Sequence, residues 1–254
     1  MTTQLGSLFL VPTPLDFGCD AEAPLQDTLP LSTLQHASRI QYWVTENAKS
    51  TRAFLKRVNE VIPLPVAIQQ ISIQELPREI HKKGDHLSDH SVDGFLKPAT
   101  LGHDVALISE AGMPAIADPG SSVVRAAHAL KIPVVPLVGP VSLLLALAAS
   151  GLNGQNFAFV GYLPQDGAIR LQRLKELEKM AQQTGQTQAW IETPYRNAAI
   201  FDAMLNALKA QTRVAICSGL TLPQMDIRCM RIQEWKSLKP FVITSLPTVF
   251  ALGI

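Results

Sequence analysis

Val105-Ala-Leu-Ile-Ser-Glu-Ala-Gly-Met-Pro-Ala-Ile-Ala-Asp-Pro-Gly-Ser-Ser122 is the stretch of sequence that decides the fold. Its first four residues are apolar, which is typical of a strand buried on both faces of a sheet. A loop containing Gly and Pro follows, and a helix is expected from about Ser121 to Leu130, with the two serines as N-cap residues. A strand, a small-residue loop and a helix in this order predict an α/β fold that binds a ligand at the carboxyl ends of its strands.

The loop between this strand and this helix has two interpretations. It is either a tight connection of the kind common in α/β proteins, or a ligand-binding loop. Its length favours the second, as do two acidic residues, Glu110 and Asp118, placed among small apolar ones. A carboxylate at a strand end is well placed to hold an ammonium or hydroxyl group of a ligand.

The composition is that of an ordinary globular protein. The chain has 254 residues, of which 47% are hydrophobic and 17% charged, and its net charge is +1. This balance excludes disorder and gives no global electrostatic case for nucleic acid, although a local basic patch stays open. The cysteines, Cys19, Cys217 and Cys229, include no C-x-x-C pair, which favours a reducing cytoplasm over a disulfide framework.

Membrane insertion is not expected. The amino terminus lacks a basic region followed by a long apolar stretch, so no signal peptide is predicted. The most apolar segment, residues 134–152, contains Pro136, Gly139, Pro140 and Ser142, which suit a strand, a turn and a buried helix better than a membrane span.

The pattern along the chain predicts two α/β domains, residues 1–138 and 139–254, with a cleft between them. Strands alternate with helices in the first half, whereas the second half has more strands near its end. Strands are expected over 8–11, 40–44, 66–73, 105–108, 133–138, 157–160, 188–191, 213–217, 227–230, 240–244 and 248–252. Helices are expected over 31–37, 48–58, 92–101 with an interruption at Pro98, 121–130, 141–150 and 169–183, and from 197 to about 210. The basic residues of the helix over 48–58 are expected to be exposed, and the apolar helix over 141–150 is expected to be buried.

Four further motifs resemble a known family. They are VVPLVGP at 134–140, FVGYLP at 159–164, IETPYR at 191–196 and TLP at 221–223. With the stretch quoted first, they resemble the tetrapyrrole methylase superfamily, and within it the ribosomal RNA small subunit methyltransferase I branch. The resemblance implies the tetrapyrrole methylase fold, with S-adenosylmethionine (SAM) in the cleft between two α/β domains, and a homodimer. No G-x-G-x-x-G loop of the Rossmann type is present.

Carried over position by position, the resemblance implies that the cofactor meets three groups of residues. One lies after the first strand and in the quoted loop, one at the head of the apolar helix, and one in the second domain. The residues are Pro12, Ala111, Gly112, Met113, Ile116, Ala117 and Asp118; Ser142; and Leu163, Glu192 and Ala215.

Several motifs depart from the pattern of the RNA-modifying members. Their A-E-D-T-R corresponds to residues 45–52, TENAKSTR, and their D-A-G-T-P to residues 110–114, EAGMP. Their A-T-P-I-G-N corresponds to residues 11–16, VPTPLD, and their A-R-E-L-T to residues 217–221, CSGLT. These changes lie on the side expected for the methyl acceptor, so they bear on the substrate more than on the cofactor.

Methyl transfer from SAM is an in-line displacement, so the protein mainly holds donor and acceptor in line, and a hydroxyl acceptor also needs a base. The candidates for catalysis are Glu46, Lys49, Arg52, Glu110 and Arg196. Four of them have a stated structural alternative. Lys49 and Arg52 would form a solvated basic helix face, Glu46 would cap that helix, and Arg196 would lie at the surface.

The resulting prediction is a cytoplasmic SAM-dependent methyltransferase that acts on a ribose 2′-hydroxyl of RNA, such as 16S rRNA in a ribosomal subunit. Two alternatives stay open, a tetrapyrrole or corrin methyltransferase and a SAM-binding protein without turnover. A third, a metal-dependent hydrolase, comes from the histidines and aspartates of one segment, but a solvated loop explains this composition better, so no metal is expected. Those residues are His81, Asp85, His86, Asp89, His90 and Asp93.

Overall fold

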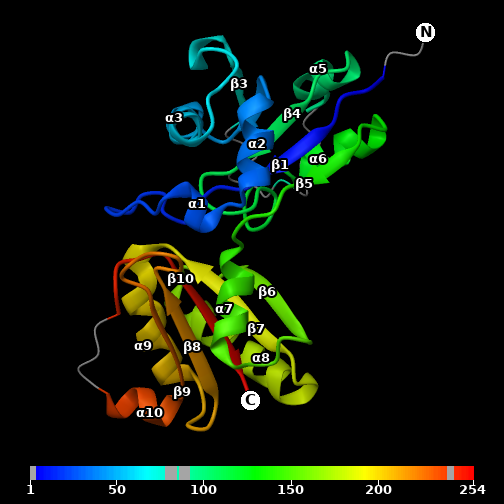
Figure 1. The fold of residues 1–254 in the computed structure, drawn as a ribbon. Helices are drawn as coiled ribbons and strands as arrows, with labels where there is room; N and C mark the ends of the chain where they lie inside the picture. The colour runs from blue at the N-terminus through cyan, green and yellow to red at the C-terminus, as the bar shows by residue number, and fades with distance from the viewer. Residues whose placement is uncertain (1–3, 78–84, 86–91, 239–242) are drawn as a thin grey trace. The chain divides into compact units, whose positions relative to one another are not determined.

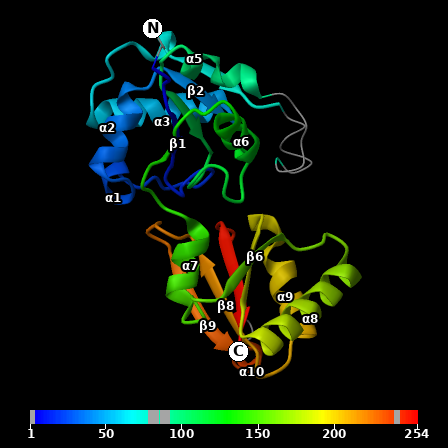
Figure 2. The same ribbon diagram turned by 90° about the vertical axis from the view of Figure 1, so that its right-hand side faces the viewer.

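The computed structural model describes residues 4–77, 85, 92–238 and 243–254. The chain divides into two compact units, residues 1–141 and 142–254, and each has its own sheet and its own core. The units are described separately below and are drawn in Figures 1 and 2.

The first unit is built on a five-stranded parallel sheet with the order β3-β2-β4-β1-β5. Its strands are β1 (Leu8–Val11), β2 (Tyr42–Thr45), β3 (Ser72–Glu75), β4 (Val105–Ile108) and β5 (Val134–Pro136). Its helices are α1 (Leu25–Thr28), α2 (Leu31–Arg39), α3 (Ala48–Val61), η1 (Ile68–Gln70), η3 (Asp93–Leu96), α5 (Lys97–Thr100) and α6 (Ser121–Ala129).

Both faces of this sheet are covered, as the continuous apolar run of β4 predicts. On one face, Ala106 and Ile108 pack with the residues of α2 and α3, including Leu34 and Leu55. On the other face, Leu107 packs with the residues of η3, α5 and α6. Figure 2 shows α2 and α6 on opposite sides of the strands. All five strands are parallel, so their carboxyl ends lie at one edge of the sheet, where the loops of the candidate site begin.

The second unit has a mixed sheet with the order β6-β7-β10-β8-β9, in which only β6 and β7 run parallel. Its strands are β6 (Phe157–Tyr162), β7 (Thr187–Glu192), β8 (Arg213–Ser218), β9 (Asp226–Arg231) and β10 (Thr248–Gly253). Its helices are α7 (Ser142–Ser150), α8 (Gly167–Thr184), η4 (Pro194–Arg196), α9 (Asn197–Ala207) and α10 (Ile232–Ser237). The last strand in sequence, β10, is therefore the central one.

The core of the second unit lies between the sheet and helices α8, α9 and α10. Trp190 and Phe250 stack with their ring centroids 5.8 Å apart, and Phe201 meets Trp235 edge to face. Helix α7 covers the opposite face of the sheet, as Figure 2 shows. Local sequence explains the limits of α8, because Asp166 Oδ1 accepts a hydrogen bond from the backbone N–H of Ile169 and Gly185 ends the helix at a φ of 67°.

Three predicted elements differ from the structure. The strand expected over 66–73 is η1 followed by β3 at 72–75, because Pro63 and Pro65 precede a short helical turn. The helix over 92–101, expected to be interrupted at Pro98, is instead divided between Leu96 and Lys97 into η3 and α5, and Pro98 lies in the first turn of α5, where its missing N–H costs little. The strand expected over 240–244 lies partly outside the described residues, and 243 and 244 are not in a strand.

The prediction that the apolar helix over 141–150 is buried is wrong on one side. Leu143, Ala146 and Leu147 face the sheet, whereas the side chains of Leu144 and Leu145 are 50% and 39% exposed. Apolar residues on all sides of a short helix indicate that any of its faces can be buried. Packing against the sheet determines which face is buried. Among the described residues, none of the helices has both the length and the apolar character that a membrane crossing needs.

Candidate functional site

The loop between β4 and α6, residues 109–120, is held against the segment that follows β1. Thr13 and Gly112 form an isolated antiparallel bridge, with N···O distances of 2.9 and 3.1 Å. The hydroxyl of Ser109 donates to the carbonyl oxygen of Gly112 at 3.1 Å, which closes the first turn of the loop. The bridge joins the residue after Pro12 to Gly112, and both Pro12 and Gly112 are predicted to meet the cofactor.

The backbone of this loop is strained at two alanines. Ala115 and Ala117 have φ angles of 65° and 63°, in the left-handed region that residues with a Cβ rarely adopt. Gly112 has a φ of 84°, and a Cβ there would lie 3.1 Å from the side chain of Leu15. Such strain persists only where the surroundings determine the conformation, and it concentrates at ligand-binding loops.

Three acidic side chains from two strand ends influence one another here. Burial, together with the charges of Asp118 and Glu110, raises the pKa of Glu46 to about 8. Burial, and then the charge of Glu110, raises the pKa of Asp118 to about 7. The structure therefore brings together two predicted catalytic residues and one predicted cofactor residue. Among the described residues, no three His, Cys, Asp or Glu side chains are arranged to hold a metal ion.

The raised pKa of Glu46 predicts a measurable effect of pH on stability. The folded protein keeps a proton on Glu46 that the unfolded chain releases from about pH 4.5, so stability falls as the pH rises from there towards 8. Glu46→Gln removes this contribution. The melting temperature of the variant minus that of the parent should be several degrees larger at pH 8 than at pH 5, as measured by thermal unfolding at both pH values. Glu60→Gln, on the exposed side of α3, is the control; equal shifts for both variants would contradict the assignment.

Helix α3 begins directly after β2 and carries the predicted Lys49 and Arg52, both exposed. Asn47 Oδ1 accepts a hydrogen bond from the backbone N–H of Lys49, and Glu75 Oε1 accepts one from that of Ala48. These two side chains cap the helix, so the alternative interpretation of Glu46 as its cap is wrong. The carboxyl group of Glu46 instead interacts electrostatically with Asp118 and Glu110.

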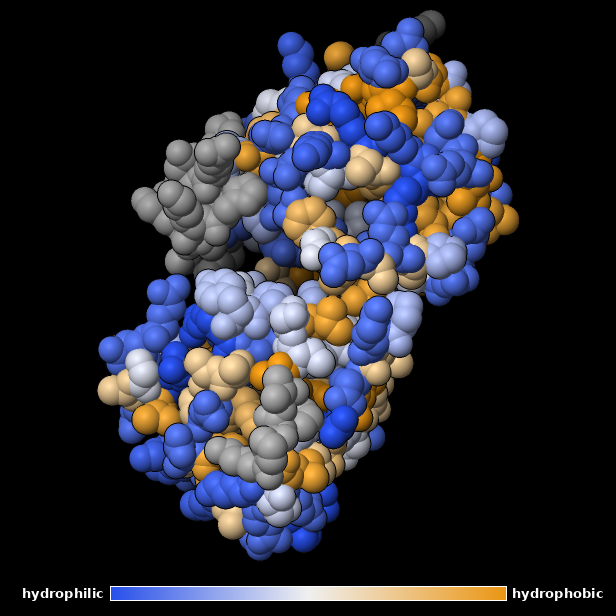
Figure 3. Space-filling model, turned by 90° about the vertical axis from the view of Figure 1, so that its left-hand side faces the viewer, coloured by the Kyte–Doolittle hydropathy of each residue, from blue (hydrophilic) through white to orange (hydrophobic). Residues whose placement is uncertain are grey.

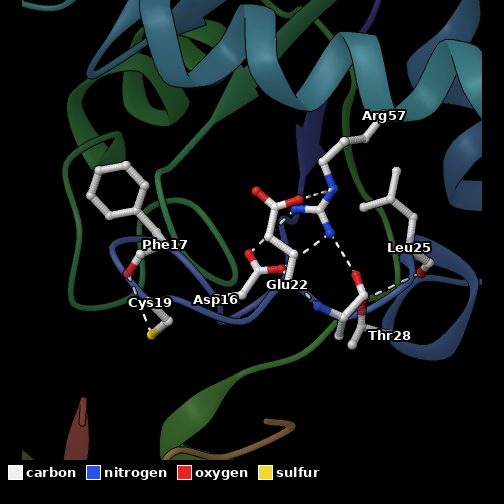
Figure 4. A network of polar contacts seen from close by, with 8 residues as sticks. Asp16, Phe17, Cys19, Glu22, Leu25, Thr28 and Arg57 are labelled. Atoms are coloured by element: carbon white, nitrogen blue, oxygen red, sulfur yellow. Dashed lines mark hydrogen bonds and ion pairs between the residues drawn. The ribbon is translucent and has the colours of Figure 1, made fainter.

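Arg57, expected to be exposed on α3, is instead half-buried and anchors the segment 16–23, here named the flap. Its Nη2 lies 3.1 Å from Asp16 Oδ2 and donates to the carbonyl oxygen of Ala23 at 2.6 Å, while Glu22 lies 3.7 Å from its Nε. Asp16 Oδ2 also accepts from the backbone N–H of Ala23 at 3.3 Å. Figure 4 shows these groups together, with the ring of Phe17 directed away from them.

In the second unit, the structure brings three predicted residues together. The backbone N–H of Leu163 donates to Glu192 Oε1 at 3.2 Å, and Arg196 Nε lies 3.2 Å from Glu192 Oε2. Arg196 Nη2 also donates to the carbonyl oxygens of Leu163 and Pro164. Burial raises the pKa of Glu192 above its usual range, although Arg196 opposes the shift. Arg196 thus fixes the turn after β6, which is a positioning role within this unit.

The remaining predicted residues are placed as follows. Ser142 is the first residue of α7, and Ala215 is fully buried in the middle of β8. Ile116 is exposed, Met113 and Ala117 lie on the same loop as Asp118, and the side chain of Leu163 belongs to the core of the second unit.

Sequence reasoning missed the residues that hold these loops in place. Asp85 lies 35 residues before Gly120 in sequence, and its carboxylate receives three hydrogen bonds at the start of α6. Arg57 lies 41 residues after Asp16. The charged residue types alone are compatible with an ion pair or a helix cap, but no local sequence pattern links positions so far apart. Of the histidines and aspartates considered for a metal, 81, 86, 89 and 90 lie outside the described residues.

Relatives of this chain were found by sequence. It is 32% identical over 218 residues to a ribosomal RNA small subunit methyltransferase I of Halalkalibacterium halodurans, and the matched region covers 85% of this chain and 65% of that protein. It is 38% identical over 140 residues to the protein of the same name from Pseudomonas aeruginosa, covering 55% of this chain and 48% of that one. The chain thus spans about half to two thirds of the length of the curated relatives it matches.

Solved structures with a similar fold were also found. The methyltransferase CobJ superposes with a TM-score of 0.57 at 14% identity, over 98% of this chain and 94% of that one. A uroporphyrin-III-C-methyltransferase from Thermus thermophilus gives a TM-score of 0.50 at 16% identity, over 98% and 92%. At these identities the likeness concerns the fold, and it confirms the predicted α/β tetrapyrrole methylase fold. Residues 31–235 match the family described as "Tetrapyrrole (Corrin/Porphyrin) Methylases", and the chain belongs to this family.

Proposed function

We propose that this protein is a SAM-dependent methyltransferase and that the loop 109–120 binds the cofactor. The observation that carries the proposal is the strained loop itself, with Ala115 and Ala117 in the left-handed region beside three mutually repelling acids. Membership of a methylase family supports it, as do relatives named methyltransferases. The small side chains of the loop let a ligand lie against the backbone.

The charge of the site fits this cofactor. SAM carries an α-ammonium and a sulfonium group, and it supplies a methyl group activated by that sulfonium. Asp118 and Glu46 are partly buried acids with pKa values raised to about 7 and about 8, so a nearby cation would stabilise their charged forms. The proposed role of the loop is to hold and orient the donor, which is most of what an in-line transfer requires.

For the acceptor, we propose a ribose 2′-hydroxyl of RNA, with a 16S rRNA-like strand or ribosomal subunit as substrate. The relatives named ribosomal RNA small subunit methyltransferase I support this choice. Glu46 is the favoured general base, because a pKa of about 8 lies close to the operating pH that general base catalysis favours. Lys49 and Arg52, exposed at the start of α3, are placed to contact the RNA rather than the reacting atoms.

Titration calorimetry with SAM alone tests the cofactor proposal. The parent should bind SAM, and more tightly at pH 8 than at pH 6, because Asp118 becomes charged through a pKa of about 7. Asp118→Asn should weaken binding about tenfold at pH 8 and remove much of the pH dependence, in line with about 1.4 kcal/mol for a charged hydrogen bond. Asp20→Asn, the same change at an exposed position of the flap, is the matched control.

Absence of SAM binding by the parent would overturn the proposed function. Equal affinities of Asp118→Asn and Asp20→Asn would remove Asp118 from the site but leave the function standing. A bulky residue at Gly112 is a weaker test, because its φ of 84° and the nearby Leu15 would strain the loop even without a ligand.

We also propose a cytoplasmic homodimer. The three free cysteines suit a reducing compartment. The exposed Leu144 and Leu145 on α7 are apolar surface that a second copy would cover, and light scattering that gave a mass near 27.6 kDa rather than twice that value would contradict the dimer.

A further inference from the structure

A pocket of about 370 Å³ lies within the first unit, between the flap, the start of α3 and the end of β4. The flap contributes Phe17, α3 contributes Lys49 and Ser50, and the segment after β4 contributes Ser109 and Glu110. Its size is at the lower end of the range for small-molecule sites. None of residues 111–118 lines it, but Ser109 and Glu110 belong both to this pocket and to the loop 109–120, and Glu110 also belongs to the acidic cluster.

Phe17 lines this pocket and is a large apolar side chain that is accessible to solvent. It is 46% exposed, although the residue before it, Asp16, is only 8% exposed. Asp16 is fixed by Arg57, so the backbone that carries the ring is anchored while the ring itself stays accessible. Figure 4 shows the ring turned away from the ion pairs. An anchored, accessible ring is a suitable platform for stacking a planar group.

A basic groove, named here for its residues Lys49, Arg52 and Lys56, runs along the exposed side of α3. These three cations lie on neighbouring turns, and none of the described residues that line the groove is acidic. The groove measures about 580 Å³ and shares Lys49 and Ala53 with the pocket. Figure 3 shows hydrophilic side chains across much of this side of the first unit. Pocket and groove are therefore neighbouring parts of one surface.

We infer that a single strand of RNA lies along the basic groove and places one unstacked base against Phe17 in the pocket. This inference rests on the proposed function and adds to it where the substrate strand binds. Phosphates would follow Lys49, Arg52 and Lys56. The base would enter a pocket whose acidic groups, Glu110 among them, can accept hydrogen bonds from the amino groups of a base but would repel a phosphate.

The chemistry of the surface favours a single strand over two other ligands. Specific recognition of RNA mostly uses unpaired bases stacked on aromatic rings, with cations along the backbone. A duplex does not offer a free base face to Phe17. A tetrapyrrole carries carboxylates around its edge, which Glu110 in this pocket disfavours, whereas the charges of Asp16 and Glu22 are offset by Arg57.

The first arm of the test concerns the ring. Binding of a fluorescently labelled single-stranded RNA octamer of mixed sequence is measured by anisotropy for the parent, Phe17→Ala and Phe17→Trp. Phe17→Ala should weaken binding about tenfold or more, since stacking of one base contributes roughly 1–3 kcal/mol, and Phe17→Trp should restore it. Leu101→Ala, at a 61% exposed apolar position of the same unit, is the control and should bind as the parent does.

The second arm concerns the groove. The slope of log K against log salt should become shallower by about 1.4 in the Arg52→Ala, Lys56→Ala double variant, at about 0.7 per lost phosphate contact. The double variant Lys97→Ala, Lys131→Ala removes two exposed lysines of the same unit outside the groove and should keep the parent slope. SAM affinity, measured alongside, should be unchanged in all of these variants.

The outcomes separate this inference from the proposed function. If SAM binds but the parent fails to bind RNA, or Phe17→Ala binds RNA as the parent does, the inference is wrong and the cofactor proposal stands. If SAM does not bind, the cofactor proposal fails whatever RNA does. If uroporphyrin III displaces the RNA and binds Phe17→Ala more weakly than the parent, the pocket belongs to a tetrapyrrole and the inference is overturned.

Discussion

Arg57→Ala is expected to destabilise the protein by about 3 kcal/mol. The substitution leaves the carboxylate of Asp16, only 8% exposed, without its ion pair at 3.1 Å. It also removes the hydrogen bond to the carbonyl oxygen of Ala23. Loss of one partner from a buried ion pair is costly, because the remaining charge stays desolvated. Calorimetric unfolding at pH 7 measures the effect.

Glu22→Ala is the matched control for this prediction. Glu22 approaches the same guanidinium at 3.7 Å, but its side chain is 69% exposed, so water screens the pair and its loss should cost at most about 0.5 kcal/mol. Similar losses for the two variants would contradict the view that Arg57 acts through Asp16. Asp16→Asn should lie between them, because it keeps the shape of the side chain and loses its charge.

Asp85→Ala is expected to cost about 2 kcal/mol at pH 7 and to loosen the loop 109–120. Asp85 Oδ2 accepts hydrogen bonds from the backbone N–H groups of Gly120 and Ser122, at 2.7 and 2.8 Å, and from the hydroxyl of Ser121 at 3.0 Å. A charged acceptor at the start of a helix satisfies otherwise unpaired donors and complements the helix dipole. Thermal unfolding measures the loss, with Asp20→Ala as the exposed control.

The pH dependence of this second prediction has a defined sign. Burial acts to raise the pKa of Asp85, but the hydrogen bonds from Ser122, Gly120 and Ser121 hold it below its usual range. The stabilisation is therefore present above the unfolded pKa of about 3.9 and disappears as the pH falls through the lower folded value. The difference between parent and variant should shrink under acid conditions. A difference that stays constant from pH 7 to pH 2 would contradict the capping role.

The sequence allowed the fold to be predicted where the signal is local. The buried strand Val105–Ile108 and the helices α3 and α8 follow from periodicity and composition over a few residues. Predictions failed where neighbours distant in sequence decide the outcome. The serines at 121 and 122 were expected to cap α6, yet its N-cap is Gly120 and the capping carboxylate belongs to Asp85.

The candidate site shows the same division. Placement of Glu46 and Glu110 at strand ends, and of Asp118 in the loop after β4, could be predicted, because parallel strands bring their carboxyl ends to one edge. Their mutual effect on pKa could not, since it depends on burial and on distances that only the folded chain defines. Arg57 illustrates the opposite error: helical periodicity predicted a solvated cation, and the flap recruits it into an ion pair.

The order of the second sheet has a consequence for how this protein is made. Strand β10 lies between β7 and β8, so the sheet stays as two separate pairs of strands until residues 248–253 have been translated. The first unit needs nothing beyond residue 141 and is free to fold while the rest of the chain is still being synthesised. During that interval β7 and β8 each present an unpaired edge, including the apolar Trp190 and Ile216. The growing chain is therefore exposed to misassembly until β10 has been synthesised, and the arrival of β10 closes both edges at once.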